Sequence, residues 1–328
     1  MKIAVIASNS FSGANFVDLL LEDKNNEVVG ISRSKEYHPL FLPYKKHQNP
    51  KFKFYQLNIN DQLDEIFDVL DAFEPEYVVN FAAQGEVGTS WKFPDQWFQT
   101  NAVGIVQFTN NLKDKKYLKR YVHISTPEVY GSCYGQDEKC STINPSTPYA
   151  ASKAAGDLFI SALFKQYNFP VVTIRSTNVY GVGQQLYRII PRSIILIKKG
   201  QKIQLHGGGK SFKSYIHIKD VCQGILKAML FGKSGEVYHL SPTDEISIKQ
   251  LVSNIIESLN KEFEDHVEIV DERPGQDAKY LIDSAKAKQA FGWMPKISLG
   301  KGINEMTNWI YSNWSEIEKM TIEYIHKK

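Results

Sequence analysis

The sequence predicts an α/β fold, with a doubly wound parallel sheet and a smaller C-terminal α/β domain that binds substrate. In the first half, short β-rich runs alternate with helical patterns, which is typical of a parallel sheet covered by helices on both faces. Beyond residue 180 the pattern loosens into short strand-like pieces mixed with helices. Residues 1–175 are therefore expected to form the first domain, with later returns near 215–240, and residues 176–328 mainly the second.

The elements can be placed in order along the chain. The expected strands and helices of the first half are KIAVIA, ANFVDLLLE, EVVGIS, a helix after Asp61, and YVVNFAA. Two further strands, YVHIS and PVVTIRS, flank a helix that begins near Pro148. Thr147 is suited to cap this helix, and Pro148 fits its first turn, where no backbone donor is needed.

Composition excludes several classes of function. The chain has 328 residues, 42% of them hydrophobic, and a net charge of only +3. Its one basic cluster, residues 113–120, is diluted by Asp114, so no nucleic-acid partner is expected. The apolar stretches are too short to span a membrane. Three widely spaced cysteines favour a reducing, cytoplasmic location and argue against a metal site.

The turn after the first strand is a candidate dinucleotide site. A glycine-rich turn at this place brings backbone amides and a helix N-terminus against a pyrophosphate. Here only Gly13 remains of the usual three glycines, with Ala7 and Ser10 at the other two positions. Both replacements are small enough for close approach, but an ordinary strand–turn–helix has the same pattern.

The end of the second strand bears on the choice of dinucleotide. An acidic residue at this place would hold the ribose hydroxyls of NAD. The sequence has Ser32, Arg33 and Ser34 instead, which suit a 2′-phosphate. NADP is therefore preferred and NAD remains possible, since surface arginines are common at strand ends.

Tyr149 and Lys153 are candidate catalytic residues. They are four apart in STPYAASK, so a helix places both side chains on one face. A neighbouring ammonium favours the phenolate, which can take a proton from a hydroxyl while a hydride leaves the carbon. YxxxK alone is also frequent by chance, but here it follows a strand that ends in the polar cluster STPE.

Several long motifs in order resemble the extended short-chain dehydrogenase/reductase family, and most of all its nucleotide-sugar 4,6-dehydratases. These motifs are VVNFAAQGEVGTSW, QTNAVG, RSTNVYGVGQ, RIIPRSI, GGGKSFKSYIHIKDV and ERPGQDAKYLIDSAKAKQAFGW. The resemblance implies a Rossmann-like domain and a retained NADP or NAD, with Thr100 near the nicotinamide ribose. It assigns to the cofactor site Ala7, Ser10, Phe11, Gly13, Ser32, Arg33, Ser34, Asn58, Ile59, Phe81, Ala82, Ala83, Thr100, Tyr149 and Lys153.

The family resemblance also implies roles for the STPE cluster. Thr126 would help Tyr149 deprotonate the C4 hydroxyl, and Glu128 would remove the C5 proton once C4 is a ketone. Pro127 stands where glucose-type enzymes have an aspartate that protonates the departing C6 hydroxyl. Either Glu128 carries that proton, or Pro127 simply fixes the backbone so that its neighbours point correctly.

The resemblance assigns the nucleotide sugar to Gln84, Asn178, Arg188, Lys213 and Arg273. Lys213 replaces the usual arginine, which loses bidentate geometry but keeps the charge. His239 and Gln276 also depart from the family pattern, and they leave the base of the nucleotide open.

Three functions remain open at this point. The first is a 4,6-dehydratase that gives a 4-keto-6-deoxy sugar nucleotide. The second is a decarboxylase or epimerase acting through a 4-keto intermediate, which Pro127 favours and for which Arg188 would hold a carboxylate. The third is a non-catalytic dinucleotide-sensing scaffold. The family resemblance further implies a homodimer that pairs the Tyr149 helix with the helix after Asn101.

Overall fold

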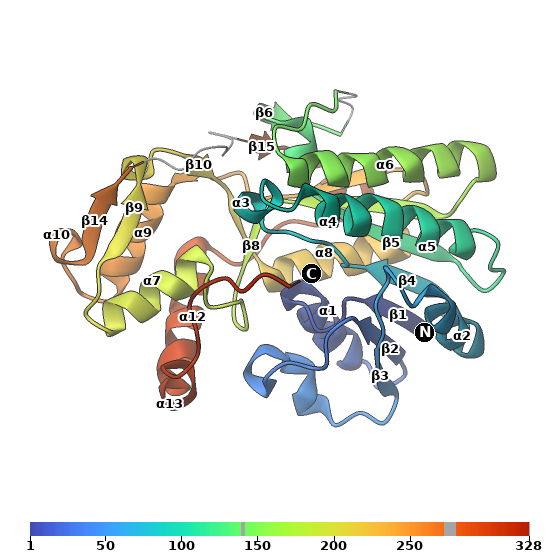
Figure 1. The fold of residues 1–328 in the computed structure, drawn as a ribbon, viewed down its shortest axis with the longest axis horizontal. Coiled ribbons are helices and arrows are strands. Elements are labelled where there is room, and N and C mark those ends of the chain that lie inside the picture. Colours follow the sequence, from blue (N-terminus) through green and yellow to red (C-terminus); the bar gives the residue numbers. More distant parts are fainter. Residues whose placement is uncertain (139–141, 272–279, 328) are drawn as a thin grey trace.

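The computed structural model describes residues 1–138, 142–271 and 280–327 (Figure 1). Its centre is a seven-stranded sheet in which every neighbouring pair is parallel. The strands lie in the order β12 (Val237–Leu240), β7 (Val171–Ser176), β5 (Arg120–Ser125), β4 (Tyr77–Asn80), β1 (Lys2–Ile6), β2 (Glu27–Ser32) and β3 (Phe52–Gln56). The predicted fold class, a doubly wound parallel sheet, is confirmed.

Helices cover both faces of this sheet. On one face lie α1 (Phe11–Leu21), α8 (Ile218–Phe231) and α11 (Ala285–Phe291). On the other lie α2 (Leu63–Phe73), α5 (Gly104–Leu112) and α6 (Pro148–Tyr167). Successive residues of β1 alternate between the two apolar cores, as the side-chain alternation of a strand requires.

The C-terminal half has its own apolar core. It is formed mainly by α7 (Ile189–Lys198), α9 (Ile248–Ser258), α12 (Leu299–Ser312) and β9 (Ile203–His206). β9 pairs with β14 (Val267–Val270). Figure 1 shows this half beside the sheet, with α7 and α12 facing it across the middle of the molecule. The division of the chain into domains at residue 175 stays a prediction.

The other elements are short, and most of them connect the two halves or lie at their edges. They are η1 (Pro39–Phe41), η2 (Pro43–His47), α3 (Val87–Ser90), α4 (Pro94–Phe98), the π-helix η3 (Gln99–Val103), η4 (Pro127–Tyr130), β6 (Cys133–Gln136), β8 (Asn178–Tyr180), η5 (Gly207–Gly209), β10 (Phe212–Lys213), β11 (Tyr215–His217), β13 (Ile246–Ser247), α10 (Phe263–His266), β15 (Tyr280–Ile282) and α13 (Trp314–Ile317). Within the described ranges, no helix is both long and apolar enough to cross a membrane.

Sequence signals at the helix starts account for the local geometry. Thr147 caps α6 by accepting a hydrogen bond from the amide of Ala150, with Pro148 in the first turn, as predicted. α1 begins at Phe11, three residues before the predicted helical run ANFVDLLLE, because Ser10 is its N-cap. Since the strands are parallel, their carboxyl ends share one edge of the sheet, and the candidate residues lie along that edge.

Candidate active site

The turn between β1 and α1 is tight, although Ala7 and Ser10 replace two of its three usual glycines. Ala7 adopts φ 61°, a left-handed conformation that costs a non-glycine residue about 1–2 kcal/mol. A Cβ on Gly13 would lie 2.2 Å from the carbonyl oxygen of Ala7, so only glycine fits there. Ser10 Oγ accepts a hydrogen bond from the Gly13 amide at 3.1 Å. The turn therefore keeps the close approach that a pyrophosphate site needs.

Two adjoining cavities lie beside this turn. The smaller, about 70 Å³, is lined by Ile6, Ala7, Ile31, Ser32, Arg33, Leu57, Asn58, Ile59, Asn60, Ala82, Ala83 and Thr100. The larger, about 280 Å³, is lined by Asn60, Gln84, Asp95, Gln96, Gln99 and Thr100. Most of the residues predicted for the cofactor thus line one small cavity, so the residues present fit a dinucleotide.

Two further residues predicted for the cofactor have partners within the protein. Thr100, predicted near the nicotinamide ribose, accepts a hydrogen bond from Asn60 at 3.0 Å and lines both cavities. Its place beside that ribose stays a prediction. The Phe81 ring packs against Phe16 of α1, with centroids 5.7 Å apart, and supports the core there.

The residues at the end of β2 are held by the first turn. Ser32 Oγ accepts a hydrogen bond from the Asn9 amide at 3.1 Å, and the Asn9 side chain donates to the carbonyl of Ser34 at 2.9 Å. Arg33 is half-buried, and its guanidinium donates to the carbonyl of Lys327 at 3.4 Å. The side chain of Arg33 therefore borders the cavity while the serines fix the loop that carries it.

The proline of the STPE cluster has a clear structural role. Pro127 is the first residue of the 3₁₀ turn η4, where a backbone N–H is not needed. Thr126 caps this turn, its Oγ1 accepting a hydrogen bond from the Glu128 amide at 3.3 Å. Gly131 ends it at φ 70°, where a Cβ would meet the Asn144 carbonyl oxygen at 2.2 Å. Pro127 thus fixes the turn that presents Thr126 and Glu128.

The structure brings Tyr149 to this turn. The phenol hydrogen-bonds the Thr126 side chain. Burial raises the pKa of Tyr149, the nearby charge of Glu128 raises it further, and the Thr126 hydrogen bond opposes both. Thr126, Glu128 and Tyr149 therefore converge at the end of β5.

Lys153 lies buried one helical turn after Tyr149. Its Nζ donates a hydrogen bond to the carbonyl of Ile124 in β5 at 2.8 Å. Burial lowers the pKa of Lys153 to about 8. Its ammonium is thus anchored to the sheet directly before the STPE turn.

A buried ionic cluster supports Lys153 and was missed by the sequence analysis. Asp157 accepts hydrogen bonds from Ser125 Oγ at 2.6 Å and from Arg175 at 2.7 Å, and it lies 3.1 Å from His123 Nε2. Burial opposes ionisation of Asp157, but Arg175 and His123 hold its pKa below the usual range. The spacing of Tyr149, Lys153 and Asp157, four residues at each step, places all three on one helix face, and this spacing could have drawn attention to Asp157.

His239 lies next to this cluster, on the side of Tyr130 and Arg175. Its Nε2 lies 2.9 Å from the Tyr130 hydroxyl, and its Nδ1 lies 3.0 Å from the carbonyl of Asp283. The ring therefore donates through Nδ1 and accepts at Nε2 in its neutral form. Burial, and next the charge of Arg175, lowers the pKa of His239 to about 3.

Replacing His239 by Gln is expected to make the free energy of unfolding fall less steeply as the pH is lowered. The unfolded chain binds a proton at His239 near pH 6.5, whereas the folded protein binds it only near pH 3. Between these values the unfolded state binds more protons, so stability falls by about 1.4 kcal/mol per pH unit of acidification. Urea unfolding midpoints measured from pH 7 to pH 4 should show a shallower decline for His239→Gln. His266→Gln, on α10, should follow the parent, and an unchanged slope in His239→Gln would contradict this assignment.

The residues predicted for the nucleotide sugar lie at several places. Arg188 pairs with Glu86 at 3.4 Å. Burial opposes the charge of Arg188, but Tyr187, Glu86 and Tyr149 outweigh it and raise the pKa of Arg188, so its guanidinium lies within electrostatic reach of Tyr149. Asn178 Nδ2 donates to the Ser214 carbonyl at 3.1 Å.

Gln84, Lys213 and Arg273 complete that set. The backbone of Gln84 is held by Asn101 at 2.9 and 3.0 Å, and Asn101 also donates to Ser152 of α6 at 2.9 Å. Lys213 lies in β10, which pairs with β13. Arg273, like Gln276, lies outside the described residues.

Comparison with known proteins decides the family. A sequence profile of the family described as GDP-mannose 4,6 dehydratase matches residues 9–306. The chain belongs to this family. It is 30% identical over 331 residues to the dTDP-D-glucose 4,6-dehydratase of Homo sapiens, covering 97% of this chain and 93% of that protein. The predicted membership among extended short-chain nucleotide-sugar dehydratases is confirmed.

Two further similar proteins support the same placement. The dTDP-glucose 4,6-dehydratase of Streptomyces niveus is 34% identical over 321 residues, with 95% of this chain and 94% of that protein covered. The crystal structure of the dTDP-glucose 4,6-dehydratase from Streptomyces venezuelae, solved with NAD bound, matches with a TM-score of 0.88 at 27% identity. That match covers 96% of this chain and 98% of the other.

Proposed function

We propose that this protein is an NAD(P)-dependent nucleotide-sugar 4,6-dehydratase, a lyase that converts a nucleotide hexose into its 4-keto-6-deoxy form. The observation that carries the proposal is the convergence of Thr126, Glu128 and Tyr149 at the end of β5. Dehydration requires a base beside the tyrosine that oxidises C4, because the C5 proton must be removed. Simple epimerisation at C4 requires no such base. Its relatives from Homo sapiens and Streptomyces niveus are named as dehydratases.

The first half of the reaction forms a ketone at C4. Tyr149 takes the proton of the C4 hydroxyl, and Thr126, bonded to the phenol, holds that oxygen in place. Buried Lys153 supplies positive charge on the same helix face, which favours the phenolate. A nicotinamide held beside these residues would supply the acceptor for the hydride of C4 and the donor of the hydride that C6 needs.

The second half eliminates water and depends on Glu128. The C4 ketone acidifies the C5 hydrogen, which Glu128 removes as a proton. The C6–O bond breaks, and the hydroxide leaves as water after taking a proton, which Glu128 delivers because Pro127 has none to give. The hydride then adds to C6, and Glu128 passes a solvent proton to C5 while Tyr149 releases the C4 hydroxyl proton to solvent, so the net change is the loss of one water.

A panel of nucleotide sugars incubated with the protein in deuterated water tests this proposal. Loss of water with one deuterium gained at C5 supports dehydration. Loss of carbon dioxide from a uronic acid would instead support decarboxylation, which the place of Arg188 near Tyr149 favours. Because Glu86 already pairs with Arg188, a substrate carboxylate would have to compete for that charge, and we rank decarboxylation second.

For the cofactor, we infer a preference for NADP carried by Arg33. The relative from Streptomyces venezuelae was solved with NAD, so the preference for NADP rests on the residues of the present chain alone. Arg33 lines the smaller cavity together with Ser32, and a 2′-phosphate would give it a charge-assisted partner.

Arg33→Ala is expected to weaken NADPH binding by roughly 10- to 100-fold, the value of one charged hydrogen bond. NADH binding should change by less than about threefold, because no phosphate is lost. Titration of dinucleotide fluorescence measures both affinities, with Lys35→Ala as a neighbouring cationic control. An equal loss for both dinucleotides would contradict the preference.

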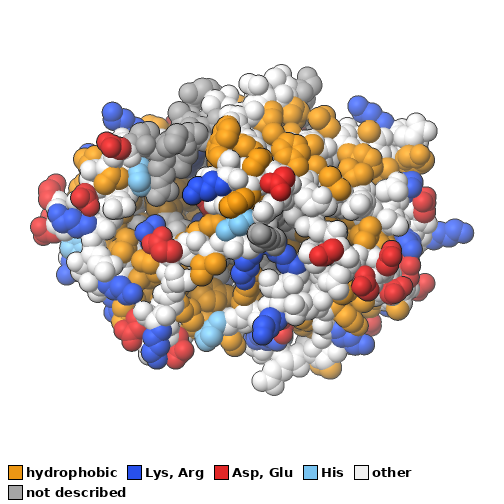
Figure 2. Space-filling model, viewed as in Figure 1, with side chains coloured by type: hydrophobic (Ala, Val, Ile, Leu, Met, Phe, Trp, Pro, Cys, Tyr) orange, Lys and Arg blue, Asp and Glu red, His pale blue; other side chains and the backbone are white. Residues whose placement is uncertain are grey.

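We also propose a homodimer through α5 and α6. Large apolar side chains are exposed on α6 and on the segment that leads into α5. Their exposed fractions are 58% for Leu158 and 59% for Tyr167 of α6, 39% for Phe98 of α4 and 42% for Val103 of η3. Figure 2 shows hydrophobic side chains gathered over these helices. Exposed apolar patches of this kind mark interaction surfaces.

Leu158→Glu is expected to convert the dimer to a monomer, because it places a charge in the centre of the apolar face. Sedimentation velocity reads the change directly. Phe231→Glu, at the end of α8, alters a side chain on another element that is even more exposed, and this protein should remain dimeric. A Leu158→Glu protein that stays dimeric would place the interface elsewhere. A cytoplasmic location stays a prediction.

A further inference from the structure

The segment that follows α13 crosses the middle of the molecule. Residues 321–327 contain no helix or strand, yet they run from the C-terminal half to the mouth of the dinucleotide site. Figure 1 shows this red segment passing between the two halves and reaching the region between α1 and α4. We call residues 321–327 the strap.

The strap is fixed to the C-terminal half at its beginning. Glu323 accepts a hydrogen bond from Arg192 of α7 at 2.7 Å. The Tyr324 ring meets the Tyr187 ring edge to face, with centroids 5.1 Å apart. Tyr187 precedes Arg188, so this contact borders the side of the site predicted for the sugar.

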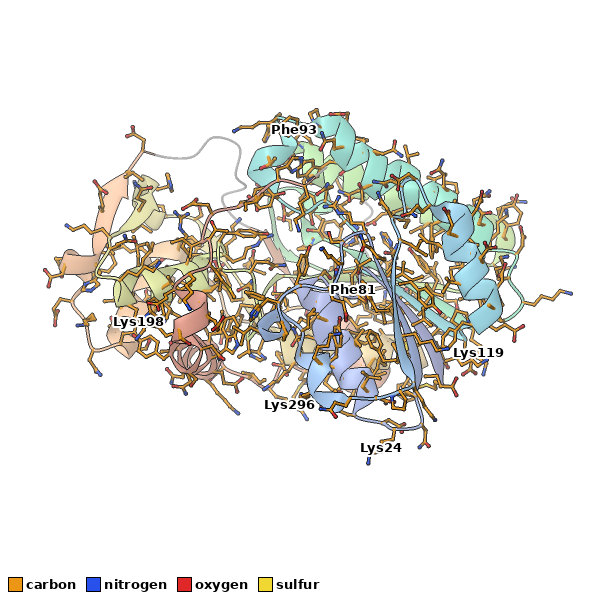
Figure 3. All side chains as sticks on the ribbon, turned by 60° about the horizontal axis from the view of Figure 1, so that its bottom comes forward. Lys24, Phe81, Phe93, Lys119, Lys198 and Lys296 are labelled. Carbon is orange, nitrogen blue, oxygen red and sulfur yellow. The ribbon has the colours of Figure 1, made fainter. Side chains whose placement is uncertain are left out.

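The strap is fixed to the Rossmann half at its end, mainly by His326. Its ring stacks on Phe93 with centroids 5.0 Å apart and on buried Trp97 at 5.4 Å. Its Nε2 lies 2.7 Å from Gln96 Oε1. In Figure 3, Phe93 lies at the outer end of the helical layer, far from Phe81 in the middle of the molecule. His326 is thus held between two rings and an amide.

Lys327 then contacts one residue predicted for the sugar and one predicted for the cofactor. Its carbonyl accepts hydrogen bonds from Gln84 at 2.9 Å and from Arg33 at 3.4 Å. Its ammonium lies 4.7 Å from the centre of the Tyr37 ring. Gln84 and Gln96 line the larger cavity and Arg33 lines the smaller one. The strap therefore contacts residues of both cavities and bridges the two halves in front of them.

From this geometry we propose that the strap closes the dinucleotide site and retains the cofactor, with His326 as its anchor. The inference rests on the proposed function, in which the hydride stored in the oxidation step is returned within the same turnover. A cofactor that is regenerated in place has no need to leave. The strap slows both its release and its entry, because either movement requires the contacts of His326 and Lys327 to open.

Two variants test the strap: a chain stopped after Met320, and the single change His326→Ala in the full chain. His266→Ala, which removes a histidine on α10, is the matched control. Release of NADPH and of NADH is followed by fluorescence after mixing with excess oxidised dinucleotide, and binding by stopped flow. Thermal melts verify that each protein is folded.

We expect both strap variants to release and bind the dinucleotide on the order of tenfold faster, the change that corresponds to about 1.4 kcal/mol. His266→Ala should match the parent. Unchanged release in folded His326→Ala and in the shortened chain would overturn the proposal, as would faster release without faster binding. Since these rates require no turnover, a protein that binds dinucleotide but dehydrates no sugar would refute the proposed function alone.

Discussion

Glu128→Gln is expected to stop dehydration while leaving oxidation at C4 intact. Glutamine keeps the size and hydrogen bonding of the side chain but cannot accept the C5 proton. The rate of product formation should fall about 10³-fold, within the range for removal of a general base. Because the hydride can then not be returned to C6, reduced dinucleotide should accumulate and its near-ultraviolet absorbance should rise on mixing with substrate.

The same experiment needs a control for charge. The carboxylate of Glu128 raises the pKa of Tyr149, so its loss alone should ease deprotonation of the phenol. Glu86→Gln removes a carboxylate that pairs with Arg188 and does not serve as the base. It should still form product. A Glu128→Gln protein with full dehydratase activity, or one in which no reduced dinucleotide appears, would contradict the assigned role.

Gly13→Ala is expected to cause the largest loss of cofactor binding. The added Cβ would lie 2.2 Å from the Ala7 carbonyl oxygen and 3.0 Å from Ser10 Oγ, so the turn must open. Overpacking of this kind costs about 1–3 kcal/mol of stability. Moving the first amides of α1 away from a pyrophosphate removes at least one charge-assisted hydrogen bond, or about 100-fold in affinity.

Gly300→Ala is the matched control for that change. No atom lies within 4 Å of a Cβ built there, and the residue is in the first turn of α12, away from the cavities. Its dinucleotide affinity, measured by fluorescence titration or calorimetry, should equal that of the parent. If Gly13→Ala bound NADPH and NADH as tightly as the parent, the turn after β1 would not be the pyrophosphate site.

Local rules explain why much of the fold was predictable. Thr147, Pro148 and Ser10 set helix starts through contacts within three residues, so their roles can be inferred from neighbours in the sequence. The alternation of strands and helices fixed the parallel sheet for the same reason. The position of β12 in the sheet, by contrast, is set by its pairing with β7, some 60 residues earlier in the chain. No local sequence pattern encodes this long-range pairing.

The candidate site also contains some residues that local rules could predict and others that only the fold brings together. Tyr149 and Lys153 were predictable because helix geometry alone places them on one face. The cluster around Asp157 was missed because His123 and Arg175 come from separate strands, β5 and β7, and meet only in the folded protein. The strap was missed for the same reason: Lys327 meets Gln84 and Arg33 across 243 and 294 residues.

Transfer of a label from C4 to C6 tests the account most directly. A nucleotide hexose carrying deuterium at C4 would be converted in ordinary water, and the position of the label in the product read by NMR. The dehydratase mechanism predicts a 4-keto-6-deoxy sugar with the deuterium at C6. The hydride that leaves C4 during the oxidation assisted by Tyr149 is the one that adds to C6 after the elimination assisted by Glu128. Deuterium found again at C4, without loss of water, would contradict it and identify an epimerase.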